Sequence, residues 1–228
     1  MKNRLLSIIL TSIALGACAS AQPAGITEES GGWKIWEGRG TINISEKALV
    51  YEPVSFQDED YDYDIEGRGP AAIAAKEIKG KNWTLDIKPA FLSDDKIYNR
   101  YTIGLWFGNK ELRPCANNQE SASLLLRRTR GPNPKDGNLI LEFRNEGKTK
   151  TVAIPMNASL FRFQRNKNKM TFFYSIGYRP NFKESFSTQI PKKTQVHFIS
   201  GARMDGKFIG KPKLRITKLE LNGNNILK

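Results

Sequence analysis

The stretch Leu160-Phe161-Arg162-Phe163-Gln164-Arg165 decides the fold class, because apolar and polar side chains alternate along it from Phe161 onward. In an extended strand successive side chains point to opposite faces, so Phe161 and Phe163 share one face. Arg162 and Gln164 share the other face for the same reason. This period of two predicts a strand with one face in a core and the other face polar.

The same alternation recurs upstream in the stretch 138–145. Leu141 and Phe143 share one face of that stretch, and Glu142 and Arg144 share the opposite face. Runs rich in β-branched and aromatic residues recur along the rest of the chain, separated by turn signals. We expect strands over residues 40–45, 48–52, 71–76, 83–91, 101–107, 123–130, 138–145, 150–154, 160–165, 170–176, 195–199 and 213–221.

A helical pattern is missing from the sequence. No long window shows apolar residues at the period of 3.6 that is typical of an amphipathic helix. Many short strands without intervening helices form antiparallel sandwiches or barrels. The sequence therefore predicts an all-β fold in which one side of each central strand lies in the core.

A signal for export occupies the amino terminus. Lys2 and Arg4 are followed by an apolar run at 5–15, which is too short to span a bilayer core of about 30 Å. The next residues, Leu15-Gly16-Ala17-Cys18, resemble the bacterial lipobox. This resemblance implies cleavage before Cys18 and attachment of membrane lipid, diacylglycerol and an acyl chain such as palmitate, to that residue.

The residues after Cys18 bear on the destination of the chain. Ala19, in place of an Asp, implies the outer membrane under the sorting rule of the lipoproteins that the motif resembles. Ordinary secretion is the alternative, because Ala19-Ser20-Ala21 also offers small residues to a signal peptidase. We expect a signal peptide at 1–17, a lipidated flexible tether at 18–32 and a single β-sandwich domain at 33–228.

The composition bounds the class of partner. The chain carries 36 Lys and Arg against 23 Asp and Glu, a formal net charge of +13, and removing Lys2 and Arg4 leaves +11. A basic surface attracts anionic partners such as acidic polysaccharides and lipid head groups. The basic residues belong to no recognisable nucleic-acid module, so nucleic acid is not expected as a partner. Cys115 is the one Cys that would remain after lipidation, which excludes an intrachain disulfide.

Several segments taken together resemble the concanavalin A-like lectin/glucanase superfamily. They are Trp83-Thr84-Leu85-Asp86-Ile87, the runs 101–107, 123–128, 160–165 and 214–221, and the hairpin around Asn138. Residues 170–177 (MTFFYSIG) are similar to the superfamily strand that ends in a Tyr-Ser turn, with Ile176 where that turn has an Asp. The resemblance implies a two-sheet antiparallel jelly roll and, more loosely, carbohydrate binding.

The segment 58–66 (DEDYDYDIE) concentrates six acidic residues. In a strand Asp62, Asp64 and Glu66 would point the same way and resemble the catalytic Glu-x-Asp-x-Glu strand of laminarinase-type glycoside hydrolases, with Asp62 in place of the first Glu. A Ca²⁺ site is a further interpretation, since this ion prefers oxygen ligands. Its candidate ligands are Asp58, Asp60 and Asp62. A solvated acidic loop is the simplest interpretation, because neighbouring carboxylates repel each other.

Aromatic and planar polar side chains on the polar strand faces predict a carbohydrate-binding site. Aromatic rings pack on the C–H faces of sugars, while carboxylate, amide and guanidinium groups bind sugar hydroxyls. The candidate residues are Trp106, Glu142, Arg144, Arg162, Gln164 and His197. We expect their strands to be neighbours, so that the six share one surface; a solvated, salt-bridged sheet face is the alternative.

The sequence therefore supports three hypotheses. The favoured one is an exported, membrane-anchored lectin-like β-sandwich that binds a polysaccharide, of acidic type if the charge matters, without turning it over. The second is a glycoside hydrolase or lyase that uses the acidic segment 58–66. The third is a structural envelope lipoprotein that binds another protein. No cofactor is expected apart from the candidate structural Ca²⁺.

Overall fold

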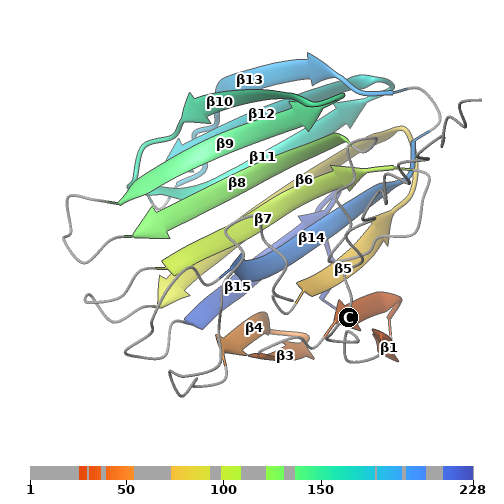
Figure 1. Ribbon diagram of the computed structural model, residues 1–228, viewed down its shortest axis with the longest axis vertical. Helices are drawn as coiled ribbons and strands as arrows, with labels where there is room; N and C mark the ends of the chain where they lie inside the picture. Colours follow the sequence, from red (N-terminus) through yellow and green to blue (C-terminus); the bar gives the residue numbers. More distant parts are fainter. Residues whose placement is uncertain are drawn as a thin grey trace, which may run out of the picture.

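The computed structural model describes residues 26–29, 31–36, 40–53, 73–92, 99–108, 122–130, 137–177, 179–191, 194–203 and 213–227. Within these ranges every regular element is a β-strand, and the strands pair antiparallel in two sheets (Figure 1). The expectation of an all-β, two-sheet antiparallel fold is therefore confirmed. The described residues contain no helix that is long and apolar enough to cross a membrane.

Sheet A has the strand order β1-β2-β5-β14-β7-β8-β9-β10. Its strands are β1 (Ile26–Glu29), β2 (Trp33–Trp36), β5 (Ile73–Ile78), β14 (Val196–Arg203), β7 (Asn99–Phe107), β8 (Ala122–Arg130), β9 (Asn138–Asn145) and β10 (Lys148–Ala153). Strands β7 to β10 follow each other along the chain, whereas β14 pairs with both β5 and β7. A strand from near the carboxyl terminus therefore holds the two halves of the sheet together.

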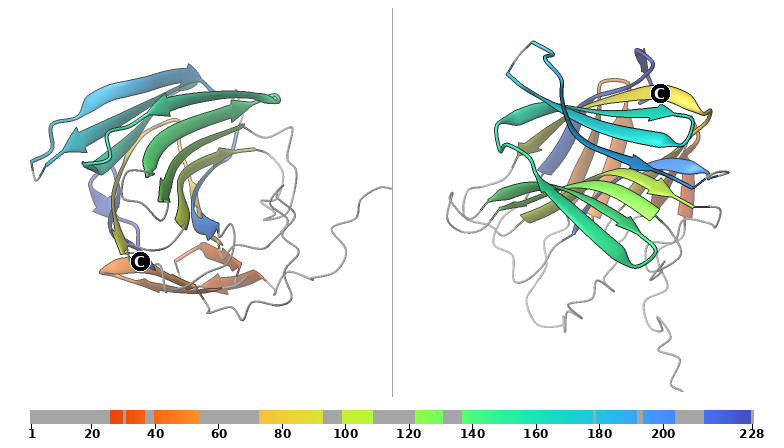
Figure 2. Two further views of the ribbon diagram at one scale, coloured as in Figure 1. Left: turned by 60° about the vertical axis from the view of Figure 1, so that its left-hand side comes forward. Right: turned by 90° about the horizontal axis from the view of Figure 1, so that it is seen from above.

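Sheet B has the strand order β13-β12-β11-β6-β15-β4-β3. Its strands are β13 (Lys183–Gln189), β12 (Lys169–Ile176), β11 (Ala158–Asn166), β6 (Asn82–Leu92), β15 (Lys213–Leu221), β4 (Ala48–Pro53) and β3 (Gly40–Ser45), with β16 (Asn224–Asn225) paired to β15. The long strand β6 lies between β11 and β15. Figure 2 shows the two sheets as curved layers that face each other.

One continuous hydrophobic core lies between the sheets, as the alternating pattern predicts. Leu141 of sheet A and Phe163 of sheet B are at most 1% exposed. Phe172 packs between two other rings, with its centroid 5.0 Å from that of Phe163 and 6.1 Å from that of Phe161. Each such buried side chain contributes roughly 1.5–3 kcal/mol relative to an exposed one. The residues that alternate with them along each strand point away from the core.

Two hairpin turns adopt the left-handed backbone conformation that twisted strands favour. Glu146 and Gly147, between β9 and β10, have φ of 49° and 73°. Asn222 and Gly223, between β15 and β16, have φ of 51° and 82°. Positive φ at both central residues is the hallmark of the type I′ turn, whose twist matches that of the flanking strands. The turn signals after β9 and β15 thus set the register of these hairpins.

The carboxyl terminus is tied to sheet A. The Nζ of Lys76 donates a hydrogen bond of 2.7 Å to the backbone carbonyl of Ile226 and lies 5.1 Å from the ring centroid of Trp33. Leu227 is only 3% exposed and belongs to the core. The burial of Lys76 lowers its pKa below the ordinary value, because the charged amine loses contact with water. These contacts close the sandwich between β5 and the end of the chain.

The structure departs from the sequence-based expectations mainly at the sheet edges. Strand β1, at Ile26–Glu29, falls within the stretch 18–32 for which no strand was expected. Strands β2 and β13 also lie outside every predicted strand range. Strands β1 and β13 form sheet edges, and the alternation in the sequence is weaker there. The twelve predicted strands are all present, with boundaries shifted by a few residues at most.

Candidate functional site

The face of sheet A that points away from the core brings four predicted site residues near each other. His197 on β14 lies directly opposite Trp106 on β7, and Trp106 lies opposite Ser123 on β8. Ser123 in turn lies opposite Arg144 on β9. Side chains that are paired across antiparallel strands share a face and lie about 4.5–5.5 Å apart at Cβ. The register therefore forms one row of polar and aromatic groups across four strands.

Glu142 occupies the next row of this face and is contacted by two arginines. Its Oε1 lies 3.1 Å from Nη2 of Arg127, and the Nε of Arg144 forms a second ion pair with the same oxygen. Neither ion pair has the geometry of a hydrogen bond at Oε1. Glu142 is 6% exposed, whereas the side chain of Arg144 is 52% exposed. Two guanidinium groups thus surround one carboxylate, and the excess positive charge is presented to solvent by Arg144.

Trp106 is fixed in place in the row that also contains His197, Ser123 and Arg144. It is 6% exposed, and its ring centroid lies 5.6 Å from that of His197 at an interplanar angle of 53°. The ring covers Gly108, where an added Cβ would lie 2.5 Å from Cη2 of Trp106. The amide of Gly108 donates a 3.1 Å hydrogen bond to the carbonyl of Gln195, which joins the ends of β7 and β14. The indole is therefore held by its neighbours and does not expose an open ring surface.

His197 is partly buried next to Trp106. Its Nδ1 is buried and has no hydrogen-bond partner among the described residues. Burial lowers the pKa of His197 below 6.5, with Glu77 acting in the opposite direction and Lys34 in the same direction. The imidazole is therefore neutral at neutral pH, and a neutral imidazole has one nitrogen that can donate a hydrogen bond and one that can accept. Such a group can bind a sugar hydroxyl in either sense.

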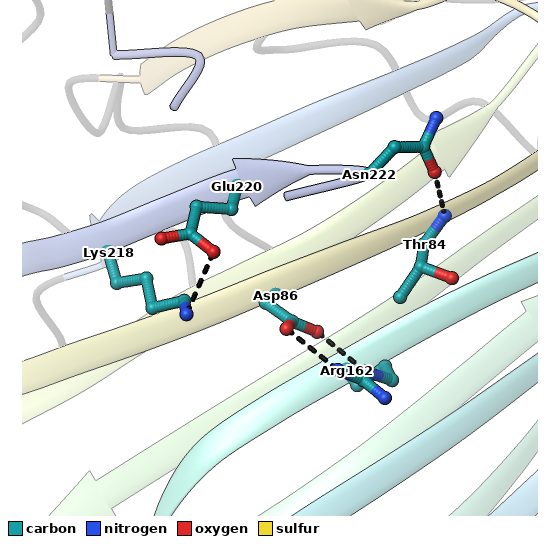
Figure 3. A network of polar contacts seen from close by, with 6 residues as sticks. All are labelled: Thr84, Asp86, Arg162, Lys218, Glu220 and Asn222. Atoms are coloured by element: carbon teal, nitrogen blue, oxygen red, sulfur yellow. Dashed lines mark hydrogen bonds and ion pairs between the residues drawn. The ribbon is translucent and has the colours of Figure 1, made fainter. Parts of the chain in front are cut away.

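The other two predicted site residues lie on sheet B. Arg162 on β11 forms a bidentate pair with Asp86 on β6, at 2.7 Å from Nε to Oδ1 and 2.8 Å from Nη2 to Oδ2 (Figure 3). Gln164 follows on the same outward face of β11. The prediction that all six residues share one surface is therefore wrong for Arg162 and Gln164. Alternation assigned each residue to the polar face of its strand but did not reveal which of the two sheets the strand joins.

Three pairs of polar groups lie on the outward face of sheet B, Arg162 with Asp86, Lys218 with Glu220, and Thr84 with Asn222. The guanidinium of Arg162 lies 3.9 Å from the ring centroid of Phe182, and its bond to Asp86 raises the pKa of Arg162. Beside it Lys218 and Glu220 form an ion pair of 2.8 Å (Figure 3). The amide nitrogen of Thr84 donates to Oδ1 of Asn222 at 2.9 Å (Figure 3). This face uses its polar atoms to hold its own strands together.

Two residues of the sheet A face were not among the predicted site residues. Arg127 and Ser123 point outward from β8 with Leu125 between them in the alternation. Leu125 is 8% exposed, so an apolar residue interrupts the polar pattern that would have identified this strand face. In the sequence, Arg127 stands two positions from each of its neighbours on that face of β8. This spacing can be assigned to the site only once the register of β8 against β9 is known.

Several predicted sites lie outside the described residues. These are Cys18, the candidate catalytic residues Asp62, Asp64 and Glu66, and the candidate Ca²⁺ ligands Asp58, Asp60 and Asp62. Among the described residues there is no group of three or more His, Cys, Asp or Glu side chains that could hold a metal ion. The lipid anchor, the acidic catalytic site and the Ca²⁺ site therefore stay predictions.

Comparison with known proteins bears on the fold. The chain superimposes on the legume lectin-like domain from Entamoeba histolytica with a TM-score of 0.58 and 11% sequence identity, over 83% of this chain and 89% of that one. The fold is a concanavalin A-like jelly roll. The predicted two-sheet jelly roll is thereby confirmed. At this identity the likeness concerns the fold alone.

Two further solved structures share the jelly roll. A functionally unknown protein from Saccharomyces cerevisiae has a TM-score of 0.51 at 11% identity, covering 80% of this chain and 95% of that one. The alginate lyase from Klebsiella pneumoniae has a TM-score of 0.51 at 8% identity, covering 84% of this chain and 95% of that one. No protein-family model and no curated protein matches the sequence.

Proposed function

We propose that this jelly roll is an exported domain that a lipid anchors in the cell envelope. It binds an acidic polysaccharide through the outward face of sheet A and does not catalyse its breakdown. The observation that carries the proposal is the cluster of Arg127 and Arg144 around Glu142, with Arg144 half-exposed. A guanidinium group that is oriented by a carboxylate presents its remaining N–H groups in a fixed direction, and its planar fork matches a uronate or sulfate group.

The neighbouring residues suit the rest of a sugar. His197 lies at the end of the row that starts at Arg144, and its neutral imidazole can donate or accept a hydrogen bond. Ser123 lies between Arg144 and Trp106 and carries a hydroxyl that can donate and accept. The formal net charge of +13 favours an anionic ligand over a neutral one.

The fold neighbours support a carbohydrate ligand. The Entamoeba domain is described as legume lectin-like, and the Klebsiella protein is an alginate lyase. Alginate is therefore a reasonable first acidic probe. The competing hydrolase or lyase hypothesis depends on Asp62, Asp64 and Glu66, so turnover of the bound polysaccharide that disappears in Glu66→Gln would favour it over simple binding.

The lipid anchor is a separate part of the proposal. Cys18 precedes the first described strand, which begins at Ile26, by eight residues. Acyl chains on this residue would hold the domain close to the membrane, since each buried CH₂ contributes about 0.8 kcal/mol. We expect labelled palmitate to be incorporated into the full chain and to be absent from Cys18→Ser. Recovery of the label in the outer membrane fraction tests the proposed location, and an unlabelled, fully soluble chain would contradict the anchor.

Binding is tested with residues 21–228, which retain every described strand. We expect binding to alginate and polygalacturonate but not to a neutral glucan, and weakening of that binding as salt rises from low to physiological concentration. Arg144→Gln should remove the part of this binding that passes through the face of sheet A. Arg215→Gln is the matched control, because Arg215 is an exposed arginine on β15 of sheet B. A folded protein that ignores both acidic polymers would contradict the proposal.

A further inference from the structure

A second concentration of positive charge lies at the turns that lead into and out of the centre of sheet B. Lys79, Gly80 and Lys81 connect β5 of sheet A to β6 of sheet B. Lys167 and Asn168 connect β11 to β12, which begins at Lys169. All four lysines are exposed. The turns are far apart in the sequence, yet β6 and β11 are neighbours, and Asn82 pairs with Asn166 at their ends.

Backbone hydrogen bonds hold the two turns together. The amide of Lys167 donates to the carbonyl of Lys81 at 2.8 Å and to Oδ1 of Asn82 at 3.0 Å. Lys167 and Gly80 have φ of 54° and 97°, so both turns are tightly bent. Because main-chain atoms make the connection, the lysine side chains start from fixed positions and remain free to meet a ligand.

A buried cation reinforces the same place. Arg165 is 6% exposed, and its Nε donates to the carbonyl of Lys167 at 2.9 Å while Nη1 donates to the carbonyl of Gly80 at 3.2 Å. Both acceptors are backbone groups. No carboxylate of the described residues forms an ion pair with Arg165 or with the four lysines. Burying a cation is costly without a countercharge, so Arg165 would stabilise an anion bound at this end of the sandwich.

We propose that these five residues, the lysine-turn cluster, form a second binding site, for the regularly spaced anionic groups of an acidic polysaccharide. The cluster consists of Lys79, Lys81, Arg165, Lys167 and Lys169. It extends beyond the site on sheet A, since none of its members lies on that face. Lysine ammonium groups on flexible stems bind anions as point charges and tolerate varied geometry, which suits the repeating charges of a polymer.

The strand register favours a polysaccharide over a membrane as the anionic partner. Ile26 is level with Trp36 and Ile73, whereas the cluster begins after Ile78, at the other end of β5. That separation is roughly 20 Å along the strand. The eight residues from Cys18 to Ile26 span at most about 28 Å. A chain anchored at Cys18 would therefore enter the domain at the end of β5 that is remote from the cluster.

The test compares two double charge reversals in residues 21–228. Lys81→Glu with Lys167→Glu changes the cluster, and Glu146 shows that Glu fits the positive φ of a hairpin turn. Lys88→Glu with Lys183→Glu makes the same change in net charge at exposed positions elsewhere on sheet B. The probes are heparin and polygalacturonate at 50 and 150 mM salt. We expect the cluster variant to bind about tenfold more weakly or worse, and the control to stay within about twofold.

The outcomes separate this inference from the proposed function. Arg144→Gln should leave the part of heparin binding that depends on the cluster unchanged, even where binding through sheet A is lost. Equal losses in the two double variants would show that only net charge matters and would overturn the inference. Binding to vesicles with 30% phosphatidylglycerol that depends on the cluster, without polysaccharide binding, would overturn it in favour of a membrane surface.

Discussion

The outward faces of the two sheets carry similar residue types, but their arginine side chains contact carboxylates in different ways. On sheet B the guanidinium of Arg162 meets both oxygens of Asp86 in a bidentate pair. On sheet A the guanidinium groups of Arg127 and Arg144 approach one oxygen of Glu142 as ion pairs without hydrogen-bond alignment there. On sheet B Arg162 is paired through both oxygens of Asp86, whereas on sheet A the side chain of Arg144 is half-exposed. The difference indicates which face has hydrogen-bonding capacity left for a ligand.

The largest effect that separates the two faces should come from their carboxylates. Glu142→Ala leaves Arg127 and Arg144 next to each other without their shared anion, and Arg127 has a side chain only 17% exposed. We expect a loss of about 3 kcal/mol in the free energy of unfolding. Asp86→Ala removes a more exposed pair and should cost about 1 kcal/mol. Chemical denaturation of both variants measures this, and an equal or larger loss in Asp86→Ala would reverse the comparison.

A smaller effect on stability is expected at Gly108, which the indole of Trp106 covers. Gly108→Ala places a Cβ within 2.5 Å of the indole, which must shift or strain the end of β7. We expect a cost of about 1–3 kcal/mol in unfolding free energy, together with weaker alginate binding. Trp106→Phe in the Gly108→Ala background should recover part of the stability because the smaller ring leaves room. Additive losses in the two substitutions would show that the ring and the glycine are not coupled.

The pH dependence of stability should also carry a contribution from the sheet A face. The folded pKa of His197 is lowered by burial, with opposing and reinforcing charges from Glu77 and Lys34. The unfolded chain therefore takes up a proton more readily, and the free energy of unfolding falls as the pH drops through about 6.5. His197→Gln should reduce the loss of stability between pH 7.5 and pH 5.5. An unchanged pH profile in this variant would show that other groups are responsible.

The smallest effect is expected in the hairpin turns. Glu146 and Lys167 adopt positive φ in one hairpin of each sheet, a conformation that costs most residues about 1 kcal/mol and Asn or Gly less. Glu146→Asn and Lys167→Asn should each raise the free energy of unfolding by about 0.5 kcal/mol. Denaturation midpoints resolve such a change, and a decrease in either variant would mean that the native side chain makes a stabilising contact.

Most of the fold could be predicted because its central strands carry complete alternation. Phe161 and Phe163 on β11, and Leu139 and Leu141 on β9, marked the core face correctly. Strand β13 was missed because it contributes mainly Phe186 to the core, 5.6 Å from Phe143 between ring centroids, in an otherwise polar segment. A single apolar residue in a sheet edge gives no period to detect.

The candidate site was less predictable. The local sequence shows which face of a strand is polar, but it does not show which of the two sheets the strand joins. Arg144 and Arg162 both follow the same alternation, yet β9 and β11 belong to different sheets. The connection between β10 and β11 crosses from one sheet to the other, and nothing in the pattern of residues marks such a crossing. The lysine-turn cluster likewise depends on the pairing of β6 with β11, which have four other strands between them in the sequence.

The most direct test of the account is a calorimetric titration of alginate into Arg144→Gln and Arg162→Gln, side by side with the unchanged protein. Both substitutions remove one guanidinium from an outward sheet face. We predict that Arg144→Gln loses the part of alginate binding that passes through sheet A. Arg162→Gln should bind alginate within about twofold of the unchanged protein, because Arg162 is already held by Asp86. Loss of binding in a folded Arg162→Gln, with binding retained in Arg144→Gln, would place the ligand on sheet B and contradict the account.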